Sequence, residues 1–161
     1  MADQRLWAPW RLEYIRGPKD EECIFCRAVE AGDDERYYVV HRNERCFVIL
    51  NAYPYNNGHV MIAPYLHQPT IETLDGETTA EMMDLAKRSA QALRDVYRPE
   101  GFNYGINQGK PAGAGIEEHV HMHVVPRWAG DTNFMPVIAD TEVLPQSLAD
   151  SWRELKEAFA K

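Results

Sequence analysis

The chain has 161 residues, 45% of them hydrophobic, and a formal net charge of −8 at pH 7. This length favours one domain with a proper core, and the acidic balance excludes a general nucleic-acid binder, which needs many basic residues. Because the apolar runs are too short to span a bilayer and the N-terminus lacks a signal-peptide pattern, we expect a cytoplasmic protein without a membrane partner.

The first half of the chain predicts an aromatic arm, one short helix and three strands. Residues 1–18 form the irregular arm, with Trp7 and Trp10 as anchors. Residues 23–31 predict a short helix that ends at Gly32. The segments that follow are rich in β-branched and aromatic residues and are separated by turn residues. They predict strands at residues 37–42, 46–50 and 59–63.

One long helix then interrupts the strands. Apolar residues recur at helical spacing over residues 77–97, and Pro99 and Gly101 end this pattern. Two more strands are predicted at 102–107 and 119–127, and an apolar stripe from Leu144 to Phe159 predicts a C-terminal amphipathic helix. Short turns favour antiparallel pairing, so we expect an α+β fold with a five-stranded antiparallel sheet.

The last predicted strand begins His-Val-His-Met-His-Val-Val. Alternate residues of a strand share a face, so His119, His121 and His123 would line one face, each about 7 Å from the next. The apolar residues between them would enter the core. Imidazole titrates near neutrality, attacks phosphorus or acyl centres, and binds zinc. The pattern alone leaves these roles open.

A glycine-rich loop precedes the histidine strand. Residues 107–115 contain three glycines, which let backbone N–H groups approach a ligand closely and bind an anion. Because this loop leads directly into the histidines, we favour an anion-binding loop over a plain flexible one. The candidate ligand-binding residues within it are Gly113, Ala114 and Gly115.

Cys23 and Cys26 form a CxxC pair. Inside a cell this spacing indicates metal or redox chemistry rather than a disulfide framework. A structural zinc would need two further ligands, and the redox interpretation is disfavoured because no βαβ pattern surrounds the pair. Two small apolar residues on a helix remain the plain alternative.

The histidine motif resembles the signature of the histidine-triad (HIT) superfamily, in which apolar residues separate three histidines. The similarity covers about residues 23–128 and includes Asn51, Gly58, His59, His67 and Asn107 with the glycine-rich run. The N-terminal arm and the Pro-Arg-Trp sequence at 126–128 resemble a bacterial branch that contains diadenosine tetraphosphate phosphorylases. The HIT-like domain would cover residues 19–130, followed by a C-terminal extension at 131–161.

The resemblance implies a nucleotidyl hydrolase or transferase. In that case His121 attacks the α-phosphorus of a nucleotide and forms a nucleotidyl-histidine intermediate, while His123 and His59 support the reaction. The resemblance further implies that Asn51 contacts the ribose and Asn107 the phosphates. Trp128 either provides a flat platform for a purine base or simply covers the core.

The resemblance also implies a structural zinc, because His67 and His119 match positions that complete a site with the two cysteines. Four protein ligands leave no open position for water. It further implies a homodimer with the two sheets joined edge to edge. The best candidate substrate is diadenosine tetraphosphate, cleaved by water or by phosphate. Two alternatives stay open: a hydrolase that uses the histidines as a catalytic zinc site, and a nucleotide-binding regulatory protein with little turnover.

Overall fold

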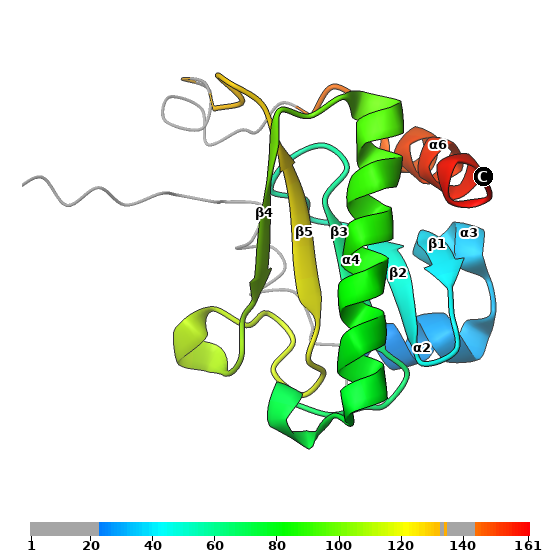
Figure 1. The fold of residues 1–161 in the computed structure, drawn as a ribbon, viewed down its shortest axis with the longest axis vertical. Coiled ribbons are helices and arrows are strands. Elements are labelled where there is room, and N and C mark those ends of the chain that lie inside the picture. Colours follow the sequence, from blue (N-terminus) through cyan, green and yellow to red (C-terminus); the bar gives the residue numbers. More distant parts are fainter. Residues whose placement is uncertain (1–22, 133, 135–143) are drawn as a thin grey trace, which may run out of the picture.

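The computed structural model describes residues 23–132, 134 and 144–161, so the arm predicted at 1–18 lies outside the described residues. Five strands form one antiparallel sheet in the order β1-β2-β3-β5-β4 (Figure 1). They are β1 (Val39–Arg42), β2 (Cys46–Leu50), β3 (Val60–Pro64), β4 (Gly101–Ile106) and β5 (Met122–Arg127). The predicted α+β class is confirmed.

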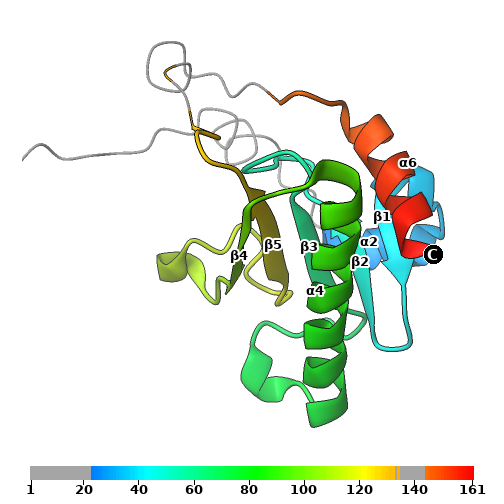
Figure 2. The same cartoon turned by 45° about the horizontal axis from the view of Figure 1, so that its top comes forward.

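Helices cover both faces of this sheet. They are α2 (Ile24–Ala31), α3 (Asp34–Tyr37), α4 (Gly76–Tyr97) and α6 (Leu148–Phe159), and two short turns, η1 (Ile71–Thr73) and η2 (Lys110–Ala112), lie in the connecting loops. Figures 1 and 2 show α4 running along one face of the sheet, with α6 beside α4. Val48 and Ile62 pack toward α4 and α6 in one core cluster, whereas Phe47 packs with Phe25 of α2 in a second cluster. Alternate strand residues enter opposite clusters because strand side chains alternate between faces.

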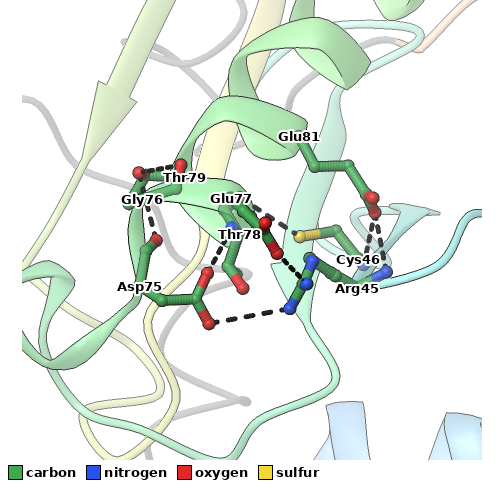
Figure 3. Close-up of polar contacts among 8 residues, drawn as sticks. All are labelled: Arg45, Cys46, Asp75, Gly76, Glu77, Thr78, Thr79 and Glu81. Atoms are coloured by element: carbon green, nitrogen blue, oxygen red, sulfur yellow. Dashed lines mark hydrogen bonds and ion pairs between the residues drawn. The ribbon is translucent and has the colours of Figure 1, made fainter.

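The N-terminal end of α4 is fastened to the turn between β1 and β2 (Figure 3). One carboxylate oxygen of Glu81 accepts hydrogen bonds from the backbone N–H groups of Arg45 and Cys46, both at 2.8 Å. The Arg45 guanidinium pairs with Glu77 and with Asp75, which caps the helix by accepting from Thr78 N–H. These contacts hold α4 against the sheet face opposite α2.

Two strand boundaries differ from the prediction by more than one residue. Tyr37 ends α3 rather than beginning the first strand, which starts at Val39, because the Asp33 side chain accepts a hydrogen bond from Arg36 N–H and caps a helical turn. The last strand begins at Met122 rather than at residue 119. The register pairs Met122 with Ile62, so continued pairing would bring Val120 opposite Pro64, which has no N–H to donate.

The C-terminal helix packs against the rest of the sheet. The Trp152 indole N–H donates to the Val39 carbonyl at 2.9 Å, and Lys156 pairs with Asp34 at 2.8 Å. These bonds occupy polar groups beside the β1 edge strand. Within the described part of the chain, no helix combines the length and apolar character that crossing a membrane requires.

Candidate functional site

Three histidines gather on the sheet face opposite α4. His121 and His123 have ring centroids 4.8 Å apart, closer than the 7 Å spacing of a regular strand, and His59 lies 5.1 Å from His123. All three are buried. Phe25 of α2 packs against His121 with ring centroids 4.9 Å apart. The structure therefore brings the three predicted catalytic histidines together.

Backbone groups decide which ring nitrogen of His59 carries the proton. Tyr55 N–H donates to His59 Nδ1 at 3.0 Å, so this nitrogen accepts. The Asn51 side-chain oxygen accepts from Tyr53 N–H, which turns its NH₂ group toward the same His59 nitrogen at 3.4 Å. The proton of neutral His59 consequently sits on Nε2.

This assignment also sets the polarity of His123. His59 Nε2 lies 2.9 Å from His123 Nδ1. Because His59 donates through Nε2, His123 accepts through Nδ1, and a neutral His123 carries its proton on Nε2. The backbone of the loop at residues 51–58 thus makes His123 Nε2 a proton donor.

His121 has the opposite arrangement. Its Nδ1 lies 2.8 Å from the His119 carbonyl oxygen, which can only accept, so the His121 proton sits on Nδ1 and the lone pair on Nε2. Burial lowers the pKa of His121 and favours the neutral ring. A neutral imidazole with a lone pair on Nε2 is suited to nucleophilic attack.

A second cluster contains Cys23, Cys26, His67 and His119, the four residues expected to bind zinc. Their ligand atoms all lie within 4.8 Å of one another. His119 Nδ1 lies 3.3 Å from Cys23 Sγ and 3.7 Å from Cys26 Sγ, and His67 Nδ1 lies 3.3 Å from Cys26 Sγ. A tetrahedral zinc with Zn–S near 2.3 Å and Zn–N near 2.0–2.1 Å spaces its ligands by about 3.3–3.8 Å. The donor set therefore fits zinc.

The surroundings of His119 also suit a metal ligand. Its Nε2 lies 2.8 Å from the Pro64 carbonyl oxygen, so Nε2 carries the proton and Nδ1 faces the thiols with a lone pair. Burial lowers the pKa of His119 to about 4. It raises the pKa of Cys26 to about 11, with a further contribution from Cys23. A metal would have to displace thiol protons in order to bind.

The strand register orders the remaining predicted site residues along β5. Leu50 pairs with Val60, and Val60 pairs with Val124, so Asn51 and His59 each lie one residue beyond, toward the Trp128 end. At the other end of β5, Met122 pairs with Ile106 of β4, and His121 and Asn107 each lie one residue beyond this pair.

The glycine-rich loop and Trp128 therefore lie beyond opposite ends of β5. Gly113, with φ of +87°, ends η2, and Ala114 and Gly115 follow it on the path toward His119. Trp128 follows β5 at its far end, and its N–H donates to Asp131 Oδ2 at 3.1 Å.

Tyr55 and Phe25 contribute to the site, although the sequence patterns did not predict them as site residues. Tyr55 bonds His59 through its backbone, and its ring stacks on His123 with centroids 5.8 Å apart. Phe25 packs against His119 as well as His121. Phe25 lies inside the CxxC pair, a position that could have suggested contact with the metal ligands, whereas no local pattern marked Tyr55.

Comparison with known proteins agrees with this geometry. The HIT domain family model matches residues 34–130. AP-4-A phosphorylase from Mycobacterium tuberculosis is 38% identical over 167 residues, which cover 98% of this chain and 85% of that protein. A solved structure of a HIT family member from Bacillus subtilis shares 30% identity with a TM-score of 0.61, covering 68% of this chain and 76% of that one.

A solved structure that contains zinc is also similar. The Zn-bound histidine triad family protein from Mycobacterium smegmatis shares 28% identity with a TM-score of 0.70, and the match covers 86% of this chain and 94% of that chain. Because the family model spans well over half of the chain and the tuberculosis relative aligns along nearly all of it, the chain belongs to the HIT domain family.

Proposed function

We propose that the protein is a nucleotidyl transferase that cleaves a nucleoside polyphosphate through a nucleotidyl-His121 intermediate. The observation that carries this proposal is the polarity of the hydrogen bonds around the histidines. The His119 carbonyl fixes the His121 proton on Nδ1 and the lone pair on Nε2, while the His59 contact makes the neighbouring His123 a donor. A nucleophile and a proton donor therefore sit side by side.

The reaction then has two displacements. His121 Nε2 attacks the α-phosphorus, a P–N bond forms, and the P–O bond to the leaving group breaks. The polyphosphate departs as an anion, and His123 Nε2–H stabilises the departing oxygen with a hydrogen bond. In the second step an oxygen of water or inorganic phosphate attacks the same phosphorus and releases His121. Splitting one displacement into two lowers each barrier.

The order of residues along β5 supports a nucleotide lying parallel to this strand. Asn51 would meet the ribose near His59, the α-phosphate would lie at His121, and the remaining phosphates would extend toward Asn107 and the glycine loop. Trp128 lies three residues beyond Val125, about 10 Å farther along an extended strand, on the side where the base would lie. This order of base, ribose and phosphates agrees with the roles expected from the sequence.

We propose diadenosine tetraphosphate as substrate and phosphate as the second nucleophile. The similarity to AP-4-A phosphorylase along nearly the whole chain supports this choice. Product analysis with and without inorganic phosphate tests it. ADP plus ATP formed only with phosphate supports phosphorolysis, whereas AMP plus ATP without phosphate would replace it with hydrolysis, and no turnover of any nucleotide would favour a regulatory binding protein.

We also propose that the cysteine and histidine cluster binds a structural zinc. Cys23, Cys26, His67 and His119 would supply all four ligands, so bound zinc would cross-link α2 to the segment before β5 and supply no reaction chemistry. The rival function, a catalytic zinc held by the histidines, is disfavoured by the polarity of their hydrogen bonds. His59 Nε2 and His123 Nε2 both carry protons, so only His121 directs a lone pair toward the site, and one imidazole does not hold a zinc ion.

A second copy of this chain is the proposed partner. β4 is an edge strand whose residues 103–105 are exposed, and Tyr104 is 52% exposed. A largely apolar hollow of about 460 Å³ lies between β4 and α4, lined by residues that include Met83 and Ile106. An unpaired edge beside an apolar surface is suited to edge-to-edge pairing. The cytoplasmic location expected from the sequence remains a prediction.

A further inference from the structure

We propose that Asp131 and Asn56 are positioning residues that hold the loop at residues 51–58. By holding this loop, they keep His59 Nε2 as the donor, and His123 Nδ1 as the acceptor, of the hydrogen bond between the two rings. The inference rests on the proposed function for the role given to His123. Asp131 lies just beyond the part of the chain that the HIT family model matches, residues 34–130.

The Asp131 carboxylate accepts hydrogen bonds from three residues in two segments of the chain. It accepts two hydrogen bonds from Arg127, at 2.6 and 2.9 Å, one from the Asn56 side chain at 2.7 Å, and one from Trp128 N–H at 3.1 Å. The Asp131 side chain is only 7% exposed. The hydrogen bonds from Arg127 hold the pKa of Asp131 at about 2, so the carboxylate stays ionised and keeps all four donors at neutral pH.

Asn56 carries this anchor into the histidine site. Its side chain also donates to the Pro126 carbonyl at 3.2 Å, so the loop is tied to the end of β5 at two points. The Asn56 backbone carbonyl accepts from His59 N–H at 3.1 Å. The preceding residue, Tyr55, donates its backbone N–H to His59 Nδ1 at 3.0 Å. One residue therefore joins the carboxylate to both groups that hold the His59 backbone and ring.

The consequence is a row of hydrogen bonds that all donate in the same direction, from Tyr55 through His59 to His123. While Tyr55 N–H faces His59 Nδ1, His59 can hold a proton only on Nε2, and His123 keeps its donor at Nε2. If the loop moves, His59 can take the other tautomer, with the proton on Nδ1, and His123 can place its proton on Nδ1 instead of Nε2. A proton on Nδ1 points toward His59 and away from a leaving group. Loop position therefore controls whether His123 can donate.

Two variants separate this role from simple stability. Asp131→Asn removes the charge that collects the donors, and Asn56→Ala detaches the loop while leaving the ion pair between Asp131 and Arg127 in place. Asp150→Asn is the matched control, because Asp150 is an exposed carboxylate that pairs with Arg153 on α6. Folding of each variant is checked by its thermal transition.

The first readout compares two substrates. The phenyl ester of AMP loses phenolate, whose charge stays mainly on the departing oxygen and depends on the hydrogen bond from His123, whereas the p-nitrophenyl ester loses p-nitrophenolate, whose charge spreads into the nitro group. Both site variants should lower kcat for the phenyl ester at least tenfold and leave kcat for the p-nitrophenyl ester nearly unchanged, and the control should change neither. Equal losses on the two substrates would overturn the proposal, because they would indicate general damage to the site.

The second readout does not depend on turnover. Long-range nitrogen NMR of the histidine rings should show His59 protonated on Nε2 in the wild type and in Asp150→Asn, and mixed tautomers in Asp131→Asn and Asn56→Ala. An unchanged His59 tautomer in both site variants would contradict the proposal. If the wild type turns over no nucleotide, the proposed function fails, and the NMR result alone decides whether the loop fixes the tautomer.

Discussion

Carbonyl oxygens and backbone N–H groups set the chemistry of each histidine in this site. The His119 and Pro64 carbonyls can only accept, and Tyr55 N–H can only donate, so the protonated nitrogen follows from the partner in each case. Four similar rings consequently differ in polarity: His119 directs a lone pair at the thiols, His121 keeps a lone pair on Nε2, and His59 makes His123 Nε2 a hydrogen-bond donor.

Replacing His121 by Ala should lower turnover by about 10⁴-fold or more, because it removes the nucleophile proposed to form the covalent intermediate. Nucleotide affinity should change little, since the ribose and phosphate contacts are expected from Asn51 and the glycine loop. Steady-state kinetics and equilibrium dialysis measure the two effects. His41→Ala is the control, because His41 packs on Phe159 away from the site. Near-normal turnover of His121→Ala would contradict the role of His121.

The sequence identified most of these residues but not their connections. The histidine motif and the CxxC pair are local patterns, and both lead to residues that the structure brings together. The contact between Asn56 and Asp131 joins residues 75 positions apart. Neither residue belongs to a periodic pattern, so no reading of the single sequence could have paired them.

At the scale of elements, strand pairing depends on side chains that do not belong to the strand. The pattern from residue 119 predicts a longer β5, but Val120 N–H donates to the Gln68 carbonyl at 2.7 Å instead of to β3. Local alternation does not reveal that Pro64 stands in the partner position. The irregular segment lets the His119 carbonyl turn toward His121, so the prediction failed where the site is built.

The connection from the loop to β3 depends on Gly58. Its φ is +78°, and a Cβ there would meet Leu93 Cδ2 at 2.8 Å and Tyr97 Cε2 at 2.9 Å. Gly58→Ala should therefore lower the free energy of unfolding by about 2–4 kcal/mol, combining left-handed strain with overpacking. Urea denaturation measures this loss. Gly101→Ala, where a Cβ meets open space, should change the free energy by less than about 0.5 kcal/mol. Equal effects of the two substitutions would refute the packing argument.

Zinc should stabilise the attachment of α2. At 100 times its dissociation constant, a ligand that binds only the folded state adds about 2.7 kcal/mol, and 1 kcal/mol shifts the Tm of a chain this size by about 2–4 °C. Adding zinc to chelator-treated protein should therefore raise the Tm by about 5–10 °C. Cys26→Ala should abolish the shift, whereas Cys46→Ala should retain it, because Cys46 lies in the core cluster beside α4. A shift that survives Cys26→Ala would place the metal elsewhere.

At the scale of the whole molecule, the two edges of the sheet differ. Beside β1, α6 supplies the Trp152 hydrogen bond to Val39, whereas β4 presents exposed residues and the apolar hollow beside α4. The sequence predicted both terminal strands but could not tell which edge a helix would cover, since that depends on where the C-terminal helix packs. Among the described residues no helix covers the outer edge of β4, which favours association on that side.

Tyr104→Asp should therefore shift the protein from dimer to monomer. The new charge would be buried at the pairing edge without a partner, which disfavours association. Sedimentation velocity over a range of concentrations measures the shift. Arg153→Asp is the control. It introduces the same carboxylate at an exposed position of α6, away from β4, and should leave the dimer intact. A wild type that stays monomeric, or a dimer that persists in Tyr104→Asp, would exclude pairing through β4.

The most direct test of the central claim is to trap the covalent intermediate. The protein is mixed with diadenosine tetraphosphate labelled at its α-phosphates, in the absence of inorganic phosphate, then denatured and digested at alkaline pH, and the labelled peptide is sequenced. We expect one nucleotidyl group per chain on His121, discharged as ADP when phosphate is added before denaturation. Label on another residue, or turnover without any label on His121, would contradict nucleotidyl transfer through this histidine.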